Sequence, residues 1–297
     1  MIGPALLAGA YDIDGNGKAD LVGVGGVPTI VRLYQNPLDG GLVLGFIGTG
    51  GGAFELVGVA DLDGDGDDDL IFQGATHYRV NLLEGDFAVA QGYVPRLGTT
   101  FAAAGDVDGD GKADLFLDGP TFFKIDLMDG VTQVGSVFIG NGNGEFPVAL
   151  VADLDGDGRV EAVSNGVSSG MIRINRVLVS QGCGSCTSFL TNGAGAFKVV
   201  AAGDVDGDGK ADLFLDGPSS TRIEQMDGLF AIGRGHVSNG GGAYPVTVVG
   251  DFDGDGKTDL ASDPRPGTVA YLRIDLLDGT LSTGRVFRPH SGFETIP

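Results

Sequence analysis

The sequence contains few residues of the kinds that build zinc sites and acid–base active sites. Its cysteines are Cys183 and Cys186, and its histidines are His77, His236 and His290, far apart in the chain. Two cysteines without a second pair or a nearby histidine do not complete a zinc site, and no nucleophile motif such as G-x-S-x-G occurs. We therefore expect a protein that is not an enzyme. The cysteine pair is open to three interpretations: a local disulfide, half of a metal site, or a redox pair.

Basic residues are scarce as well. Eighteen Lys and Arg face 40 Asp and Glu, which gives a formal net charge of −22. Such a chain is a poor partner for nucleic acid and for anionic membrane surfaces, and no apolar run is long enough to span a bilayer. We expect neither nucleic-acid binding nor membrane insertion, and cations are the favoured partners. The first residues lack the basic segment of a signal peptide, so we expect a mature or excised piece of a longer product.

Glycine and apolar residues are plentiful. The chain has 55 glycines, 42% hydrophobic residues and a mean hydropathy of +0.15. This apolar content is sufficient for a buried core and argues against disorder. Frequent glycine without a collagen-like triplet indicates many tight turns between short segments. The composition therefore favours an all-β fold.

A nine-residue acidic motif, such as "DVDGDGKAD", occurs six times. The copies occupy residues 12–20, 61–69, 106–114, 153–161, 204–212 and 251–259, and their first aspartates are separated by 49, 45, 47, 51 and 47 residues. Each copy is preceded by an apolar run and followed by a short apolar run, an alternating segment and a last segment that ends in a glycine-rich turn. Four short strands at this period predict the blades of a β-propeller, whereas solenoid coils are much shorter.

The spacing of the copies predicts the number of blades. The third and fifth copies, and also the fourth and sixth, are 98 residues apart, which indicates duplicated blade pairs. An even set favours a closed six-bladed propeller of four-stranded antiparallel blades; the alternative is a seven-bladed propeller that lacks a blade. We expect the tail "SGFETIP" to close the ring. The expected single domain spans 1–297, with blades at about 5–53, 54–100, 101–145, 146–196, 197–243 and 244–297.

The acidic motif has the chemistry of a calcium loop between the first two strands of each blade. Carboxylates at its first, third, fifth and ninth positions supply the oxygens that Ca²⁺ prefers, glycine at the sixth allows a sharp turn, and the seventh residue can offer its backbone carbonyl. Four close carboxylates repel one another unless a cation lies among them or their pKa values rise. Mg²⁺ is the alternative ion, but it demands stricter octahedral geometry. The sequence predicts about six Ca²⁺, one per blade.

The motif departs from an EF-hand, which requires a glutamate at position twelve. Here position twelve holds Gly, Phe, Leu or Ser, and strand-like sequence flanks each loop. Because its fifth position is a neutral Asn16, we expect the first loop to bind Ca²⁺ most weakly. The predicted metal-site residues are Asp12, Asp14, Asn16, Lys18, Asp20, Asp61, Asp63, Asp65, Asp67, Asp69, Asp106, Asp108, Asp110, Lys112, Asp114, Asp153, Asp155, Asp157, Arg159, Glu161, Asp204, Asp206, Asp208, Lys210, Asp212, Asp251, Asp253, Asp255, Lys257 and Asp259.

The D-h-D-G-D-G-x-x-D loop between short strands, preceded by a glycine-rich turn and Phe, resembles the FG-GAP (VCBS-type) repeat of integrin α-subunit propellers, bacterial secreted propellers and certain fungal lectins. The resemblance covers essentially the whole chain. It implies that the calcium loops have a structural role on one face, and that partners bind on the opposite face or between blades. It also implies an extracellular, secreted protein.

Polar side chains recur near the turn between the second and third strands, where a ligand could bind. The candidates are Gln73, His77, Asp118, Asn165, Asp216 and Asp263, and ordinary turn chemistry is the alternative explanation. Each third strand also begins with a base: Arg32, Arg79, Lys124, Arg173, Arg222 and Arg273. We expect these bases to pair with acids two residues further along the same strand face, such as Asp126 and Asp275.

Near-identical repeats favour repeated binding over catalysis, which needs one distinct site. The first hypothesis is a calcium-stabilised interaction or adhesion module that binds a protein or carbohydrate ligand. We expect the protein to be a monomer. The alternative is a lectin. The absence of tryptophan weakens the lectin hypothesis, because Tyr78, Tyr244 and Tyr271 would have to provide the aromatic surfaces for sugars.

Overall fold

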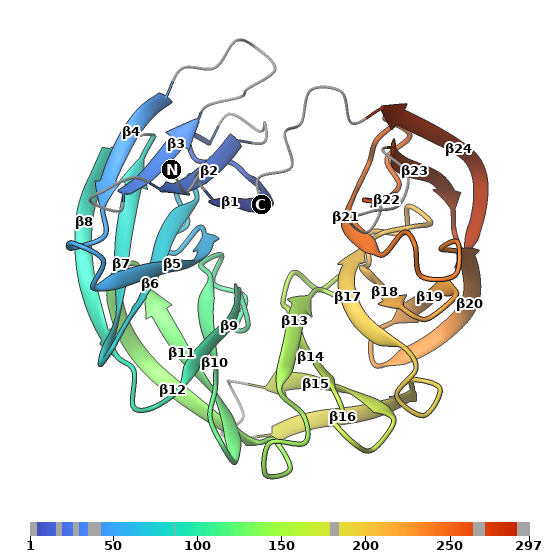
Figure 1. Cartoon of the computed structure of the whole chain (residues 1–297). Coiled ribbons are helices and arrows are strands. Elements are labelled where there is room, and N and C mark those ends of the chain that lie inside the picture. Colours follow the sequence, from blue (N-terminus) through green and yellow to red (C-terminus); the bar gives the residue numbers. More distant parts are fainter. Residues whose placement is uncertain are drawn as a thin grey trace. The chain divides into compact units, whose positions relative to one another are not determined.

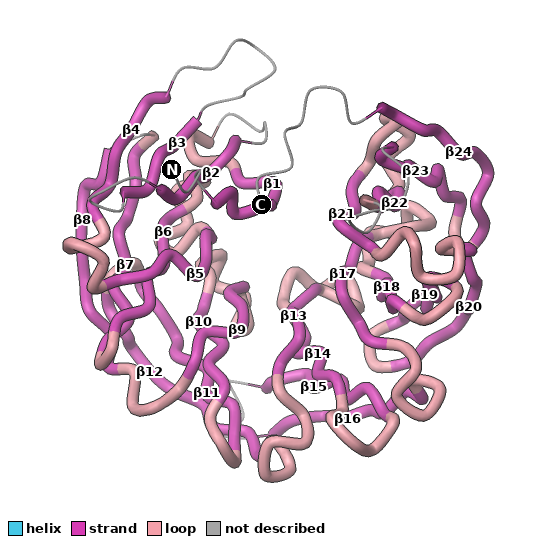
Figure 2. The backbone as a smooth tube through the Cα atoms, in the orientation of Figure 1, coloured by secondary structure: helices cyan, strands magenta, loops and turns pink. Residues whose placement is uncertain are grey.

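The computed structural model describes residues 5–15, 20–25, 30–34, 43–85, 87–178, 184–263 and 271–289. Within these ranges the chain is all-β, as predicted, and consecutive strands of the same sheet are neighbours (Figures 1 and 2). No helix there has the length and the apolar character needed to cross a bilayer. The predicted ring closure by residues 291–297 lies outside the described residues, as do Cys183 and His290.

Six four-stranded sheets form in the described ranges, each in the order of the sequence. The first three sheets contain β1 (Ala5–Tyr11), β2 (Asp20–Gly25), β3 (Ile30–Tyr34) and β4 (Val43–Gly48); β5 (Phe54–Ala60), β6 (Asp69–Gly74), β7 (His77–Glu84) and β8 (Phe87–Pro95); and β9 (Thr100–Gly105), β10 (Asp114–Asp118), β11 (Phe122–Asp129) and β12 (Thr132–Gly140).

The other three sheets contain β13 (Val148–Ala152), β14 (Glu161–Asn165), β15 (Met171–Leu178) and β16 (Gly184–Thr191); β17 (Lys198–Gly203), β18 (Asp212–Asp216), β19 (Ser220–Asp227) and β20 (Phe230–Ser238); and β21 (Val246–Gly250), β22 (Asp259–Ser262), β23 (Tyr271–Asp278) and β24 (Leu281–Pro289). The chain divides into two compact units, with the boundary between residues 139 and 140.

Burial differs systematically among the strands of a sheet. From the second sheet to the sixth, the second strands are buried on both faces; Leu115, Phe116 and Leu117 of β10 are all fully buried. The fourth strands alternate between exposed and half-buried residues, as in β12, because one of their faces meets solvent. Apolar runs therefore become second strands, and alternating segments become outer strands.

The cores lie between consecutive sheets of a unit. In the second sheet, Leu70 and Phe72 pack in one cluster with Val22 and Val31 of the first sheet. Between them in sequence, Ile71 packs in another cluster with Leu115 of the third sheet. Successive residues of a strand point to opposite faces, so a single strand contributes to two cores. A fully buried side chain of this size contributes about 1.5–3 kcal/mol.

Consecutive sheets of a unit are also joined at the ends of their first strands. The backbone carbonyl of Asp61 accepts a hydrogen bond of 2.7 Å from Ala113 N, and that of Leu62 accepts one of 2.9 Å from Gly130 N. In the second unit, the carbonyl of Asp153 accepts a hydrogen bond of 2.8 Å from Ala211 N. The acidic motif of one sheet is thereby fastened to the motif of the next.

Candidate functional site: the acidic loops

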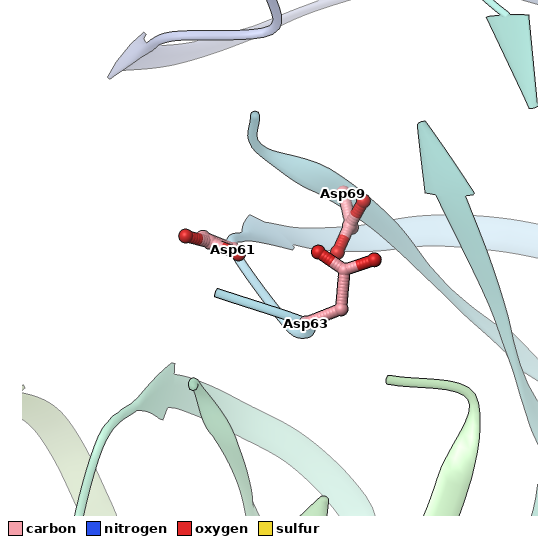
Figure 3. A group of neighbouring side chains, drawn as sticks. All are labelled: Asp61, Asp63 and Asp69. Atoms are coloured by element: carbon pink, nitrogen blue, oxygen red, sulfur yellow. The ribbon is translucent and has the colours of Figure 1, made fainter. Parts of the chain in front are cut away.

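Each acidic motif connects the first strand of a sheet to the second, as predicted. In the second sheet the loop spans residues 61–68 between β5 and β6, and Figure 3 shows Asp61, Asp63 and Asp69 around it. The loop takes its shape from its own first residue. Asp61 Oδ1 accepts a hydrogen bond of 2.6 Å from Gly64 N, and Asp61 Oδ2 accepts one of 3.0 Å from Gly66 N.

The glycines are required because the backbone turns through the left-handed region. The φ angles of Gly64 and Gly66 are +81° and +95°, values that other residues rarely adopt. The third, fourth, fifth and sixth loops repeat the pattern; Asp204, for example, accepts hydrogen bonds of 2.7 and 2.8 Å from Gly207 N and Gly209 N. The predicted sharp turn at the sixth position is confirmed.

The ninth carboxylate is buried and ties the loop to the sheet. Asp69 Oδ2 accepts a hydrogen bond of 2.8 Å from Leu62 N, and Asp69 Oδ1 accepts one of 2.8 Å from Leu83 N in β7. Asp114 is held in the same way by Val107 N and Met128 N. A carboxylate has about four lone-pair sites, so two hydrogen bonds leave acceptor capacity for a cation.

Carboxylate oxygens converge in every acidic loop from the second to the sixth, within 4.8 Å of one another. In the second to fifth loops the converging residues come from the first, third and ninth positions, and in the sixth from the first, third and fifth. The groups are Asp61, Asp63 and Asp69; Asp106, Asp108 and Asp114; Asp153, Asp155 and Glu161; Asp204, Asp206 and Asp212; and Asp251, Asp253 and Asp255.

The other predicted metal-site positions have different local roles. Fifth-position acids accept hydrogen bonds from the backbone of the seventh residue, as Asp110 Oδ1 does from Lys112 N at 2.9 Å. Seventh-position lysines turn their side chains to acids at the end of the third strand, as in the ion pair of Lys210 Nζ with Asp227 Oδ1 at 2.8 Å. The lysine side chains therefore pair with acids, and the role predicted for the seventh backbone carbonyl stays a prediction.

Burial disfavours the charged form of the clustered carboxylates. It raises the pKa of Asp69 and of Asp114 to about 7, and that of Asp212 to about 6. Burial, followed by the charge of Asp65, also raises the pKa of Asp63. Asp63 Oδ1 is a buried oxygen without a hydrogen-bond partner in the described part of the chain. An oxygen-ligated cation fits this arrangement, because it would supply both the missing charge and the missing partner.

The first loop is described in part. Asp12 N donates a hydrogen bond of 2.8 Å to Asp68 Oδ2, which links the first loop to the second. Asn16 and Lys18 lie outside the described residues, and so does the side chain of Asp20, although its backbone begins β2. The predicted weak binding by this loop therefore stays a prediction.

The predicted ligand residues lie at the opposite end of each sheet, and two of them fasten strands. Gln73 Oε1 accepts a hydrogen bond of 3.1 Å from Phe101 N, and the Asn165 amide bonds both Val199 N and Val199 O. Exposed His77 contacts Thr76 and the Tyr93 ring. The remaining candidates are half-buried at or just after the ends of second strands: Asp118, Asp216 and Asp263.

The expected pairing of third-strand bases is confirmed where an acid follows. Lys124 Nζ pairs with Asp126 Oδ1 at 2.7 Å, and Arg273 Nε pairs with Asp275 Oδ2 at 2.6 Å, all four side chains being buried. Arg222 pairs with Glu224 in the same way. Arg79 differs, because Asn81 occupies the acid position. Its guanidinium lies over the rings of Phe54 and Phe72.

Sequence reasoning missed a recurrent aromatic group at this far end. A ring at the start of the first strand covers the guanidinium of the third strand and meets a ring of the fourth strand edge-on or tilted. The groups are Phe54, Arg79 and Tyr93; Phe146, Arg173 and Phe189; Phe197, Arg222 and His236; and Tyr244, Arg273 and Phe287. The aromatic residue after each glycine-rich turn was the available signal. We call these the far-end aromatic groups.

One of the tyrosines considered for sugar binding is not accessible. Tyr78 is fully buried, and its hydroxyl lies 3.3 Å from Thr99 Oγ1. Tyr78 points into the core because it follows His77 by one residue, and neighbouring residues of a strand face opposite sides. Tyr271, by contrast, is 45% exposed. Cys186 is exposed on β16 as a free thiol, and Cys183 lies outside the described residues.

Comparison with known proteins supports the sequence resemblance. The model of the FG-GAP-like repeat matches residues 153–215, which contain the fourth and fifth acidic motifs. The predicted relationship to this repeat is therefore confirmed. No curated protein matches the chain.

Solved structures show the fold. A lectin of Agrocybe aegerita that recognises non-reducing terminal N-acetylglucosamine is 17% identical, with a TM-score of 0.66 over 96% of this chain and 79% of the lectin. Hsv2 of Kluyveromyces lactis is 11% identical, with a TM-score of 0.51 over 92% of this chain and 74% of the other. At these identities the likeness concerns the propeller-like arrangement of sheets alone.

Proposed function

We propose that this chain, which carries the FG-GAP-like repeat, is a secreted, calcium-stabilised binding module built as a six-bladed β-propeller. The observation that carries the calcium proposal is the repeated convergence of carboxylates from the first, third and ninth positions within 4.8 Å. The proposal explains why buried acids recur at the same place in successive sheets. The repetition of one acidic motif supports binding in place of catalysis, because catalysis normally needs one distinct site.

Calcium suits the donor set better than magnesium. The clusters offer several carboxylate oxygens, and Ca²⁺ accepts six to eight oxygens in irregular geometry. Mg²⁺ requires an octahedron and retains water. In the second loop, the residues that would hold the ion are Asp61, Asp63 and Asp69, with Asp65 and the carbonyl of Asp67 completing the set. The ion would supply positive charge among buried carboxylates.

The role proposed for calcium is structural. Each loop is bonded to its neighbour in the same unit through backbone hydrogen bonds, such as Ala113 N to Asp61 O. An ion that fixes one loop would therefore restrain two sheets. This leaves the opposite ends of the sheets for ligand binding.

Thermal unfolding tests the calcium proposal. An ion that binds the folded chain and not the unfolded chain raises the melting temperature. We expect a large rise on adding Ca²⁺ to protein treated with EDTA, and a much smaller rise with the same concentration of Mg²⁺. Identical melting curves in Ca²⁺ and in EDTA would contradict the proposal.

Carbohydrate is the ligand class that the far-end aromatic groups favour. In three of these groups the fourth-strand ring is exposed: Tyr93 by 54%, Phe189 by 50% and Phe287 by 49%. Exposed rings beside polar turn residues present a flat apolar surface with hydrogen-bonding groups near it, which suits a sugar. The similar fold of the Agrocybe lectin agrees with this choice. A protein ligand in an adhesion role is the alternative.

A glycan array in Ca²⁺ buffer tests the ligand class. We expect binding of simple terminal sugars at several sites per chain, and we expect Tyr93→Ser and Phe287→Ser each to lower the number of sites by one. Phe230→Ser is the matched control, because Phe230 is 68% exposed at the other end of its fourth strand. A folded chain that binds no glycan would eliminate the lectin hypothesis and leave the protein ligand.

A further inference from the structure

Arg176 brings a basic side chain to the acidic loop of the fourth sheet. In β14 and β15 Ala162 pairs with Asn175, so one residue further along Glu161 faces Arg176. In the second, third, fifth and sixth sheets, the strand register extended by one residue puts a neutral side chain opposite the ninth acid. These side chains are Leu82, Leu127, Gln225 and Leu276.

The guanidinium lies among the acids of the fourth loop. Arg176 Nη2 forms ion pairs with Asp155 Oδ2 and, at 3.1 Å, with Asp157 Oδ2. Arg176 Nε lies 3.2 Å from Oε1 of Glu161, whose side chain is 1% exposed. Asp155 and Glu161 are two of the three residues whose oxygens converge in this loop. One cation of the chain therefore already occupies the neighbourhood of the convergent oxygens.

The second and fifth loops provide the contrast. In the described part of these loops, the clustered acids form no ion pair with a basic side chain. The residue at the equivalent position in the fifth sheet is Gln225, whose neutral Nε2 donates a hydrogen bond of 2.9 Å to Asp206 Oδ2. A neutral donor leaves the charge of the cluster uncompensated, whereas a guanidinium does not.

A calcium ion fits the fourth loop poorly for two reasons. Arginine keeps its charge at all ordinary pH values and its planar fork bonds several carboxylate oxygens at once, which uses the acceptor sites that the ion would need. Ca²⁺ placed among the same oxygens would also lie beside a like charge. The fourth loop further differs in having Glu161 at the ninth position, where the other loops have Asp. The two departures occur in the same repeat and contact each other.

We infer that Arg176 is the built-in cation of the fourth loop, which therefore takes no Ca²⁺ while loops without such a base do. This inference rests on the proposed calcium binding of the other loops. It revises the sequence expectation of one ion per repeat, because the fourth acidic motif adds no Ca²⁺ to the count. The fourth loop also stays fixed when calcium is removed.

Native mass spectrometry in Ca²⁺ counts the ions on the folded chain and tests the inference. Arg176→Leu installs the residue found in the second, third and sixth sheets, and Arg176→Gln installs that of the fifth. Each variant gains one Ca²⁺ over the wild type. Leu127→Arg is the reciprocal change in the third sheet, and it loses one Ca²⁺. Arg234→Gln is the control for net charge: Arg234 pairs with Glu224 away from the loops, so its calcium count is unchanged.

The outcomes separate this inference from the calcium proposal. A wild-type chain that binds no Ca²⁺ overturns both. A wild-type chain that binds Ca²⁺, while folded Arg176→Gln or Arg176→Leu gains no ion, overturns the inference alone. If one Arg176 variant does not fold, the other and Leu127→Arg still decide. Hydrogen exchange gives a second readout: in EDTA, the Gly156 and Gly158 amides of the wild type stay more protected than Gly207 and Gly209 of the fifth loop, and equal protection contradicts the inference.

Discussion

The backbone carbonyl of Asp204 accepts a hydrogen bond of 2.6 Å from Thr258 N, which fastens the fifth acidic loop to the sixth. The preceding pair in the same unit, Asp153 O and Ala211 N, is bonded at 2.8 Å. The loops of one unit thus form a series in which the first residue of each holds the eighth residue of the next. Because these hydrogen bonds join neighbouring loops, an interaction that makes one loop more rigid also restrains the next loop.

This series makes the effect of a loop substitution extend beyond its own sheet. Asp206→Asn keeps an acceptor for Gln225 but removes a carboxylate from the fifth cluster. We expect the variant to bind one Ca²⁺ fewer and to show faster hydrogen exchange at Thr258 N in Ca²⁺ buffer, because the partner loop has lost its ion. Native mass spectrometry and hydrogen exchange measure the two effects.

Asp227→Asn is the matched control for that substitution. Asp227 lies in the same sheet, is 58% exposed and pairs with Lys210 at the surface. Exposed pairs contribute about 0–1 kcal/mol, so stability changes little. The number of bound ions stays at the wild-type value. Loss of an ion from Asp227→Asn would show that charge in general, and not the cluster, governs binding.

We expect the pH dependence of stability to reverse between the calcium-free chain and a calcium-loaded one. Burial raises the pKa of Asp69 and Asp114 from the ordinary 3.8 to about 7. Between these values the folded, calcium-free chain holds protons that the unfolded chain has released. Its free energy of unfolding therefore rises as the pH falls from 8 towards 4. In Ca²⁺ the acids must be ionised to bind, so acid removes the stabilising ion.

Melting curves at pH 5 and pH 8, with Ca²⁺ and with EDTA, measure this reversal. We expect the rise in melting temperature caused by Ca²⁺ to be much larger at pH 8. We also expect the EDTA-treated chain to melt at a higher temperature at pH 5 than at pH 8. An equal calcium effect at both pH values would mean that the clustered acids do not take up protons in the folded chain.

The buried pair of Arg273 and Asp275 predicts a large loss of stability when the acid is removed. Both side chains are buried, and Arg285 Nε also bonds Asp275 Oδ1 at 2.7 Å. Asp275→Ala leaves a buried guanidinium without its carboxylate, and we expect a cost of about 3–5 kcal/mol. Urea unfolding measures it. A loss below about 1 kcal/mol would contradict the structural role of the pair.

In the second sheet, an acid can be added beside a buried base that lacks one. Arg79 is buried beside Asn81, and both Arg79 Nε and Asn81 Oδ1 are without hydrogen-bond partners in the described residues. Asn81→Asp supplies the acid that Arg273 and Lys124 already have, so we expect an increase in the urea midpoint. A decrease would show that the rings of Phe54 and Phe72 stabilise this guanidinium sufficiently and that a second buried charge is costly.

The parts of the site that depend on residues close together in the sequence could be predicted from the sequence. The spacing of Asp61, Gly66 and Asp69 predicts a tight turn with converging carboxylates, because neighbours in sequence determine that geometry. The pairing of Lys124 with Asp126 follows from two residues that share one face of a strand. Both predictions concern contacts within a few residues.

Contacts between strands were not predictable in the same way. Arg176 lies opposite Glu161 because of the register of β14 and β15, and reading that register from the sequence requires knowing where each turn places its residues. Tyr78 was considered for sugar binding because it is aromatic and near a turn, but its strand parity directs it into the core. The aromatic groups at the far end likewise combine residues from three different strands.

Gly92 lies where two consecutive sheets of the first unit approach too closely for a larger side chain. A Cβ at Gly92 in β8 would lie 2.5 Å from Val131 O, a backbone atom in the turn between β11 and β12 of the next sheet. A backbone carbonyl cannot rotate away as a flexible side chain can, so Gly92→Ala forces the two sheets apart. We expect a loss of about 1–3 kcal/mol in the free energy of unfolding, typical of overpacking.

Gly48→Ala in β4 is the control, because a Cβ there meets nothing within 4 Å. The methyl group restricts the unfolded chain without a clash in the folded one, so we expect unchanged stability or a gain of about 0.4–1 kcal/mol. Urea unfolding of both variants separates a packing effect from a general intolerance of alanine in the outer strands. Equal losses for Gly92→Ala and Gly48→Ala would rule out the close approach of Val131 as the cause, since Gly48 has no neighbour to displace.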